Sequence, residues 1–391
     1  MASERKPRFP KAIPNPAGKT LEKPQLEKLV SNNQALIEPP EILDLGILTP
    51  LLQDPDITEI MVNDVRNVMV EIKGRIANTS IRFQRNEEIH ALIRTMIGDR
   101  QILIDDYHPY ANFSLSDGSR VNIVHPPVTE KGPCITIRKF PKRLSAQDLT
   151  ESKFWDERIA TFLHSCVVGN LNILISGGTG SGKTSLMNVL ANMIPKSERI
   201  LTIEDTPELH LLQKNTVQMI TQPPSPSHSG ITARDLMTNS LRMRPDRIII
   251  GECRSDEALD MLQAMNTGHD GSMTTIHANA ARESISRLET LCMMTGVEIP
   301  LRAIRRQIVN AIDLVVQVSR FRNGYRRIVS IQEVVGMEGE IVTMQELFHY
   351  QYHPVSPDGA RHGTFKSLGL IPSFTEKLKE QGIQFPPSFF S

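Results

Sequence analysis

The sequence has few cysteines, and their spacing forms no metal-binding or disulfide pattern. Cys134, Cys166, Cys253 and Cys292 include no Cys-x-x-Cys pair, which excludes a zinc ribbon and a small disulfide framework. An excess of either charge is also missing, because 44 basic side chains balance 44 acidic ones. We therefore expect no bulk attraction to nucleic acid or to an anionic membrane.

Long apolar runs are missing too. The longest contain about five residues, as in "RIIIGE", whereas roughly 18 are needed to span a bilayer. The basic residues 1–20 are not followed by an apolar segment, so we expect no secretory signal. These absences favour a protein that is cytosolic or peripheral to a membrane.

The composition that remains is that of a globular protein. Apolar residues make up 39% and charged residues 23% of the 391 residues, a length that predicts two or three domains. Seven prolines precede Glu41, and they offer little to bury. Residues 1–44 are therefore expected to form a mobile, Pro-rich or helical arm.

Residues 45–143 predict a small α+β domain. Alternating apolar residues in "NVMVEIKGRI" and "ANFSLSDGSRVNIV" are typical of strands, and Asp117–Gly118 marks a hairpin turn. Apolar residues at one-face spacing over 89–97 predict a helix, with Asn86 as its expected N-cap. The domain is expected to end at the basic, proline-interrupted stretch 139–143.

Residues 144–391 alternate short apolar runs with helical patterns. A helix with Gly169 as its C-cap precedes "NILIS", "ILTIE", "TVQMI", "RIIIGE" and "SMTTIH", and helical patterns separate most of these runs. This alternation predicts a mostly parallel sheet covered by helices on both faces. After Asp313 the pattern changes to meandering strands with a two-residue turn at Asn323–Gly324.

The sharpest signal lies in "NILISGGTGSGKTSLMNVL", where a complete P-loop stands between an apolar strand and an amphipathic helix. Glycines let backbone amides surround the β-phosphate of ATP, and the helix N-terminus adds a positive dipole. Lys183 is expected to bridge the β- and γ-phosphates, and the Thr184 hydroxyl to bind Mg²⁺. The loop and its first helical turn comprise Gly177, Gly178, Thr179, Gly180, Ser181, Gly182, Lys183, Thr184 and Ser185.

Carboxylates follow two of the apolar strands. We interpret Glu252, after "RIIIG", as the base that orients and deprotonates the attacking water, with Mg²⁺ held by Thr184, phosphates and waters. Glu204 ends the strand "ILTIE" and is expected to hold a water molecule that is itself bound to Mg²⁺. Its neighbour Asp205 fits a role in the site and a role as a loop carboxylate equally.

Two histidines lie in "NTGHDGSMTTIHANAAR". An imidazole at the end of a central strand can reach a γ-phosphate and respond to hydrolysis, since both ring nitrogens donate when protonated. His277 directly follows a β-prone run and fits this role. For His269, a structural role is an equal alternative.

Several arginines are candidates for further positive charge at the transferring phosphoryl group. Arg120, next to the "SDGS" turn, and Arg138 lie on predicted strands of the first domain, where a solvated position is the equal alternative. The range Arg302–Arg327 holds seven arginines and one acid, Asp313, which fits a subunit contact or a solvated face equally. The candidates that flank Glu252 are Arg242, Arg244, Arg247 and Arg254.

These motifs, in this order, resemble the secretion-ATPase superfamily of type II and type IV secretion and type IV pilus motors. Four boxes carry the resemblance: "GGTGSGKT", "LTIEDTPEL", "SLRMRPDRIIIGECR" and "EALDMLQAMNTGHDGSMTTIHAN". The similarity covers roughly residues 45–374 and is greatest to the CpaF-type tight-adherence (Tad) pilus assembly ATPases. It implies an α/β fold, with a RecA-like P-loop ATPase domain and C-terminal extension (144–391) after a smaller α+β domain (45–143).

The resemblance also implies roles for individual residues. Arg120 and Arg138 match the arginines that the N-terminal domain of such proteins presents to the phosphates. The other matching positions are Lys183 and Thr184 in the nucleotide loop, Glu204 in the acidic box, Glu252 as the catalytic glutamate, and His269 and His277 in the histidine box.

For the whole protein, the resemblance implies Mg²⁺-dependent ATP hydrolysis by a ring homo-hexamer, cytoplasmic and at the inner face of the cytoplasmic membrane. Ring motions would act on an inner-membrane platform protein that adds or removes pilin subunits, so membrane association would be peripheral and through partners. The sequence departs from the family in a short N-terminal arm, in the lack of a tetracysteine zinc module, and in the less similar segment "QILIDDYHPYANFSL".

Other functions share the same core. A type IV secretion traffic ATPase carries the same boxes and is the main alternative. A DNA translocase is disfavoured by the balanced charge and by only 5% aromatic residues, so no nucleic-acid partner is expected. A nucleotide-gated binding module without turnover is disfavoured by the intact Lys183 and Glu252.

Overall fold

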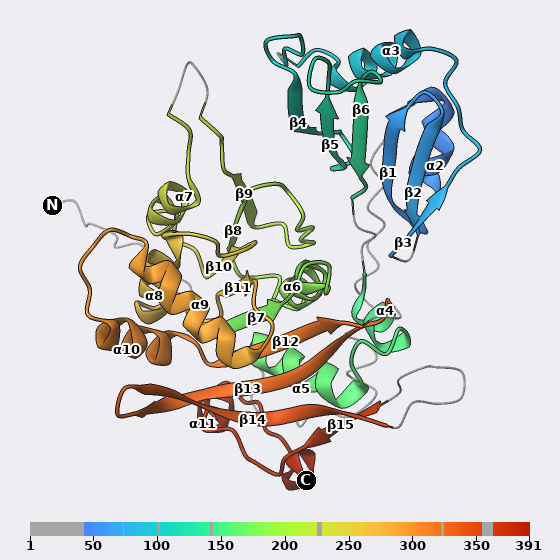
Figure 1. Cartoon of the computed structure of the whole chain (residues 1–391). Helices are drawn as coiled ribbons and strands as arrows, with labels where there is room; N and C mark the ends of the chain where they lie inside the picture. Colours follow the sequence, from blue (N-terminus) through green and yellow to red (C-terminus); the bar gives the residue numbers. More distant parts are fainter. Residues whose placement is uncertain are drawn as a thin grey trace, which may run out of the picture.

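The computed structural model describes residues 43–391 apart from 73, 101, 141–143, 225–228, 322–323 and 354–362. The arm expected over residues 1–44 lies outside the described residues up to residue 42, and so does Asn323 of the expected turn. Figure 1 shows two bodies, each built on its own sheet. In the described part of the chain, no helix has the length and apolar character that crossing a membrane requires.

The first body is a six-stranded sheet in the order β3-β2-β1-β6-β5-β4, and its paired strands are antiparallel. Alternation places Val68 and Val70 of β2 in the core, together with Ile89 and Met96 of α3. The predicted α+β class is thus confirmed. The elements are η1 (Gly46–Leu48), α2 (Thr49–Gln53), β1 (Ile57–Asp64), β2 (Asn67–Ile72), β3 (Arg75–Asn78), α3 (Asn86–Ile97), β4 (Tyr110–Ser114), β5 (Arg120–Val124) and β6 (Cys134–Arg138).

Two local predictions in this body have different outcomes. The hairpin at Asp117–Gly118 is confirmed, because Gly118 adopts φ +85° and Asp117 Oδ1 accepts the Ser119 amide at 2.9 Å. The N-cap prediction is wrong by one residue, since the cap of α3 is Arg85, in extended conformation and without a side-chain cap bond. Asn86 lies inside the helix, and its Nδ2 donates to the Lys131 carbonyl at 3.4 Å instead.

The second body is a nine-stranded sheet in the order β15-β14-β13-β12-β7-β11-β10-β8-β9. The strands β12, β7, β11, β10, β8 and β9 are parallel to one another. Strands β13, β14 and β15 continue the sheet beyond β12 as an antiparallel meander. The predicted mostly parallel sheet and the change after Asp313 are both confirmed. The strands are β7 (Ile173–Gly177), β8 (Ile200–Glu204), β9 (Thr216–Ile220), β10 (Arg247–Ile250), β11 (Met273–Ile276), β12 (Leu314–Arg320), β13 (Arg326–Glu338), β14 (Ile341–Tyr352) and β15 (Gly363–Ser367).

Helices cover both faces of this sheet (Figure 1). One face packs on α5 and α6 and the other on α7 to α10. The C-cap of α5 is Gly169, as predicted. The helices are α4 (Ala146–Glu151), α5 (Glu157–Val168), α6 (Lys183–Ala191), α7 (Ala233–Ser240), α8 (Glu257–Asn266), α9 (Ala281–Met293), α10 (Leu301–Ala311), α11 (Thr375–Glu380) and η2 (Pro387–Phe390).

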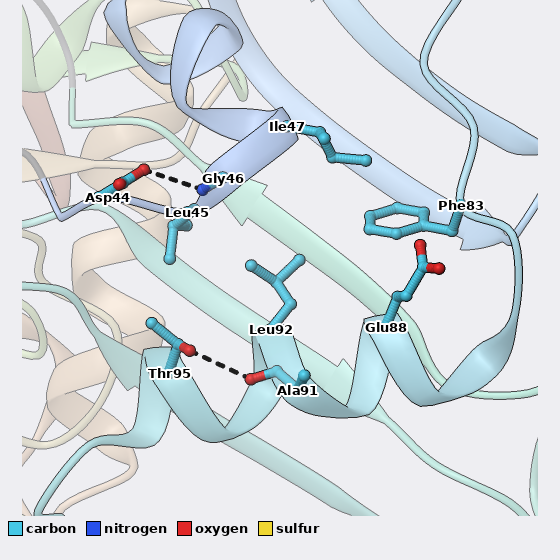
Figure 2. A pocket seen from close by; sticks show the side chains of 9 residues that line it. All are labelled: Asp44, Leu45, Gly46, Ile47, Phe83, Glu88, Ala91, Leu92 and Thr95. Atoms are coloured by element: carbon cyan, nitrogen blue, oxygen red, sulfur yellow. Dashed lines mark hydrogen bonds between the residues drawn. The ribbon is translucent and has the colours of Figure 1, made fainter.

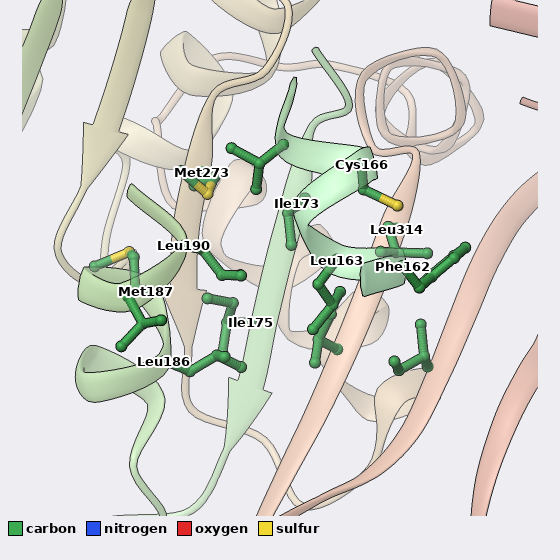
Figure 3. Close-up of a cluster of buried hydrophobic side chains, with 14 of the residues drawn as sticks. Phe162, Leu163, Cys166, Ile173, Ile175, Leu186, Met187, Leu190, Met273 and Leu314 are labelled. Carbon is green, nitrogen blue, oxygen red and sulfur yellow. The ribbon is translucent and has the colours of Figure 1, made fainter. Parts of the chain in front are cut away.

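Strand β7 is buried along its whole length and sends alternate side chains to the two faces. Ile173 and Ile175 pack with Phe162 and Leu186 of the helices α5 and α6 (Figure 3), whereas Leu174 belongs to the opposite core. Burial of each such side chain contributes roughly 1.5–3 kcal/mol. The loop that leaves β7 at its carboxyl end is therefore anchored on a fully buried strand.

Candidate functional site

The P-loop runs from Gly177, the last residue of β7, to Lys183, the first residue of α6. Gly180 and Gly182 adopt φ +66° and +100°, a region that favours glycine. At Gly177 the backbone is ordinary, but a Cβ would lie 2.5 Å from Ser181 Oγ and 2.6 Å from the Val318 carbonyl oxygen. Glycine is therefore required at positions 180 and 182 by the backbone conformation and at position 177 by the lack of space for a Cβ.

Three side chains of the loop and its first helical turn carry polar groups that a phosphate or a metal ion could bind. Lys183 Nζ donates to the carbonyl oxygens of Gly177 (3.0 Å) and Gly178 (3.2 Å). Burial lowers the pKa of Lys183, and the nearby Glu252 charge opposes that shift. Ser181 Oγ is buried and has no hydrogen-bond partner among the described residues. Thr184, in the first turn of α6, is half-exposed and so accessible to a metal ion.

Glu204 ends β8 at the same edge of the sheet as the P-loop. Its side chain is buried, and Oε1 accepts the amides of Glu208 (2.9 Å) and Leu209 (3.0 Å). Burial raises the pKa of this carboxyl to about 7, although the two amide bonds oppose the shift. Oε2 has no hydrogen-bond partner within the described parts of the chain. A buried carboxylate oxygen and the hydroxyl of Thr184 are the type of donors that Mg²⁺ and its waters take, so these residues fit the ion.

The lack of a side chain at Gly251 leaves space for the side chain of Glu204. A Cβ at Gly251 would lie 3.1 Å from Glu204 Cγ, so a side chain there would press on the buried carboxylate. Strands β8 and β10 are paired with Ile203 beside Ile250, which brings their carboxyl ends together. The glycine before Glu252 therefore leaves room for Glu204 instead of supplying a ligand itself.

Glu252 is held by a guanidinium. Arg254 donates to Glu252 Oε2 through Nε (2.7 Å) and Nη2 (2.5 Å), and its Nη1 reaches Asp205 Oδ2 at 3.2 Å. The turn is fixed by Glu257, a buried residue whose Oε1 accepts the amides of Arg254 (2.6 Å) and Ser255 (2.9 Å). Sequence reasoning missed Glu257, for which the signal is an acid at the start of the helix that follows the strand.

The two candidate histidines lie at opposite ends of the central strand β11, His269 before its amino end and His277 after its carboxyl end. Strand β11 is parallel to β7, with Ile276 beside Ser176, so His277 follows at the level of the P-loop and is exposed. His269 precedes β11, where its Nδ1 and the Ala264 carbonyl are 3.2 Å apart. The structure brings His277 to the P-loop edge and places His269 at the other one.

Arg120 and Arg138 of the first body are cross-strand neighbours on β5 and β6. Arg120 forms an ion pair with Glu208, four residues after Glu204. Arg138 is exposed, and its charge contributes to lowering the pKa of Arg326, for which burial is the main cause. Arg120 therefore contacts a residue beside the acidic box of the second body, whereas Arg138 forms no such ion pair in the described structure.

The arginines near Glu252 have different surroundings. Arg242 and Arg244 are exposed, whereas Arg247 is fully buried at the amino end of β10. Arg247 donates to Glu198, to the Asn170 side chain and to the Gly271 carbonyl. That position is structural and lies at the edge opposite the P-loop, so Arg254 is the member of this group that joins the site.

The basic stretch Arg302–Arg327 does not form one surface. Arg305 on α10 is paired with Glu289, and Arg327 on β13 donates to the Tyr350 hydroxyl. At the β12–β13 hairpin, Arg326 Nε donates to the Gly180 carbonyl of the P-loop at 2.8 Å. Arg320, its cross-strand neighbour, lies near Glu71 of the first body, with 3.8 Å between Nη2 and Oε1. Arg326 is thus a site residue that motif reasoning left unassigned, and Arg320 beside it links the hairpin to the first body.

A cavity of about 250 Å³ lies in the first body between η1 and α3 (Figure 2). Its lining contains the carboxylates of Asp44 and Glu88 together with apolar residues such as Phe83 and Leu92, and no basic side chain. Phosphate groups would find no positive charge there, so the P-loop edge is the candidate nucleotide site.

Comparison with known proteins agrees with this geometry. The family model described as "Type II/IV secretion system protein" matches residues 41–347. The chain belongs to this family. The type IV secretion system protein VirB11 of Bartonella quintana is 31% identical over 77% of this chain and 94% of its own length. The secretion-ATPase superfamily suggested by the motifs is thus confirmed at the level of the family.

Two further similar proteins differ in how much of each chain the match covers. The uncharacterised protein MJ0781 of Methanocaldococcus jannaschii is 43% identical over 59% of this chain, but the match spans only 33% of MJ0781. The crystal structure of the pilus retraction motor PilT with bound ADP is 19% identical, has a TM-score of 0.56 and covers 87% of each chain. That likeness shows the fold, a P-loop ATPase domain after a smaller N-terminal domain, and confirms the predicted fold class.

Proposed function

We propose that this chain hydrolyses ATP with Mg²⁺ at the P-loop edge of the nine-stranded sheet. The observation that carries the proposal is the convergence of the P-loop, Glu204 and Glu252 at one edge, on strands β7, β8 and β10. Ligands bind at the carboxyl ends of strands in open parallel sheets, which supports this edge as the reaction site.

Each group has a proposed task. Lys183, which now donates to its loop carbonyls, would contact the β- and γ-phosphates, and Thr184 and Glu204 would hold Mg²⁺, Thr184 directly and Glu204 through a water molecule at Oε2. Glu252 deprotonates and orients the attacking water. The magnesium ion, when bound, neutralises charge that develops on the phosphates.

The remaining polar groups of the site would stabilise charge on the transferring phosphoryl group. His277 stands at the level of the loop, and Arg120 and Arg138 approach from the first body. His269, which we also proposed for this site, lies at the far edge and would act only through the intervening strand. Positive charge supplied by a second domain makes turnover depend on how the two bodies are placed.

For the whole protein, we propose a ring homo-hexamer that works at the cytoplasmic face of the inner membrane on a platform protein of a Tad-type pilus, for assembly or retraction. The resemblance of the four boxes to CpaF-type ATPases supports this assignment. The chain binds the membrane peripherally, through that platform protein. No nucleic acid takes part in this function.

The alternative is a type IV secretion traffic ATPase. The observation that favours it is the 31% identity to VirB11 over most of both chains. The two functions differ in the membrane protein that binds the motor. Cross-linking in cells followed by identification of the integral membrane partner separates them, because a pilus platform protein supports the first and a secretion-channel component the second.

The proposed activity is tested on the purified full-length chain. We expect ATP hydrolysis with Mg²⁺, no hydrolysis with excess EDTA, and the mass of a hexamer by light scattering when ATP and Mg²⁺ are present. The Lys183→Gln variant should lose ATP binding and turnover together. A wild-type protein that binds ATP and never hydrolyses it would contradict the proposal and favour a nucleotide-gated binding module, and stimulation of turnover by DNA would favour a translocase.

A further inference from the structure

The segment between β8 and β9, residues 205–215, lies against the P-loop helix. The His210 amide donates to Asn188 Oδ1 at 2.8 Å, and Asn192 Nδ2 donates to the His210 carbonyl at 2.8 Å. The Leu212 amide in turn donates to Asn192 Oδ1 at 2.9 Å. Two asparagines of α6 and its C-cap thus hold the segment by its backbone, so its position follows that of the P-loop helix.

The beginning of the segment is fixed at the metal side of the site. Glu204 Oε1 accepts the amides of both Glu208 and Leu209. The backbone of Glu208 is therefore attached to the carboxylate that faces the proposed magnesium position. A buried carboxylate with two amide donors is a firm anchor, because losing these bonds leaves buried polar groups unpaired.

The outer side of the segment contacts the first body. The Glu208 carboxylate forms an ion pair with Arg120 Nη2, and the rings of His210 and Phe140 meet edge to face with centroids 4.3 Å apart. The Glu208 and Arg120 side chains are 26% and 37% exposed. Partial burial makes this pair less screened by solvent than a surface ion pair.

We propose that Glu208 is a positioning residue that holds Arg120 at the edge of the site and releases it to the phosphate groups of ATP. The inference rests on the proposed binding of ATP at the P-loop. Arg120 is the group that the proposed function directs to the phosphates, and its guanidinium is already engaged by a carboxylate. Nucleotide binding then exchanges one anionic partner of Arg120 for another, and this exchange loosens the contact between the segment and the first body.

The proposed exchange predicts whether removing the Glu208 charge strengthens or weakens ATP binding. Because Glu208 competes with the phosphates for Arg120, Glu208→Gln should bind ATP more tightly, by about five- to tenfold, where a purely structural role would weaken binding. Glu208→Asp keeps the charge and should stay close to wild type. Binding of ATP to the full-length chain, measured by isothermal titration calorimetry in Mg²⁺ at low temperature, gives the dissociation constants.

The decisive control repeats the comparison in an Arg120→Ala background. The inference requires that Glu208→Gln no longer changes the dissociation constant there, since no guanidinium remains to be released. If the tightening persists without Arg120, it comes from the general loss of a negative charge, and the inference is overturned. Weaker binding by Glu208→Gln, or no change, overturns it as well.

The same titrations separate this inference from the proposed function. A wild-type chain that binds ATP without hydrolysing it would remove the ATPase proposal, yet the four dissociation constants would still decide the role of Glu208. Conversely, turnover with no coupling between positions 120 and 208 would leave the ATPase proposal intact and remove the inference.

Discussion

At the scale of single residues, Gly182 is the part of the P-loop with the least conformational choice. Its φ of +100° costs about 1–2 kcal/mol for a residue with a side chain, and a Cβ would lie 3.2 Å from the Phe154 ring. We expect Gly182→Ala to lower the free energy of unfolding by about this amount. Denaturant titration of the variant and the wild type measures the difference.

Gly178 provides the matched control for this prediction. Its φ is not in the left-handed region, and a Cβ there would meet no atom within 4 Å. Gly178→Ala should therefore leave the free energy of unfolding unchanged. Equal losses in the two alanine variants would show that the conformation of Gly182 is not what makes glycine necessary.

The sequence allowed part of the site to be predicted at this scale. Lys183, Glu204 and Glu252 could be found because each follows a recognisable apolar strand, and parallel strands end at one edge. Glu208 and Glu257 were not assigned, because Glu208 acts through an ion pair with Arg120 of the first body and Glu257 through two loop amides that it accepts. The N-cap of α3 was misplaced for a related reason, since Asn86 bonds a residue far away in the chain.

At the scale of secondary-structure elements, the β12–β13 hairpin reaches back to the P-loop. Because Arg326 holds the Gly180 carbonyl, Arg326→Ala should loosen the loop and weaken ATP binding by about tenfold, the loss expected for one charged hydrogen bond. Titration of ATP into the purified variant measures the effect.

An exposed arginine from the same basic stretch serves as the control. Arg302→Ala removes the same charge from an exposed position on α10 that has no bond to the P-loop in the described structure, so this variant should bind ATP like the wild type. If both variants weaken binding equally, the effect of Arg326 is one of overall charge and not of its bond to the loop.

Periodicity predicted the elements themselves well, but not their long-range contacts. The alternating runs of the second body became strands β7 to β11, and the C-cap Gly169 was confirmed. The approach of Arg320 to Glu71 joins residues of different bodies, and no local pattern encodes it. The same limit applies to the histidines, since only the direction of β11 shows that His269 and His277 face opposite edges.

At the scale of the whole molecule, the first body contacts the second beside the proposed phosphate site, through the Arg120–Glu208 ion pair. Arg120→Ala and Arg138→Ala should each lower turnover by about a hundredfold, because each removes a donor for charge on the transferring phosphoryl group. Steady-state hydrolysis measures this, with the exposed Arg242→Ala as a control that keeps its activity. Unchanged turnover in both variants would mean that the first body takes no part in the reaction.

The overall architecture followed from the order of patterns along the chain, an α+β sheet followed by a mostly parallel one. The contacts between the bodies did not follow from that order, because Glu208, although it lies in one of the four boxes, pairs with Arg120 of the first body, and Phe140, which meets His210, lies outside the boxes. Motifs identify the reacting groups, whereas the segments that connect them to the rest of the molecule become visible only in the fold.

ATP hydrolysis by Glu252→Gln, measured with ATP binding on the same sample, tests the ATPase proposal most directly. The substitution keeps the size of the side chain and removes the base, so we predict wild-type affinity for ATP and a turnover lower by roughly 10²–10⁴-fold. A variant that hydrolyses ATP as fast as the wild type, while the wild type is itself active, would show that Glu252 is not the base and that the reacting groups lie elsewhere.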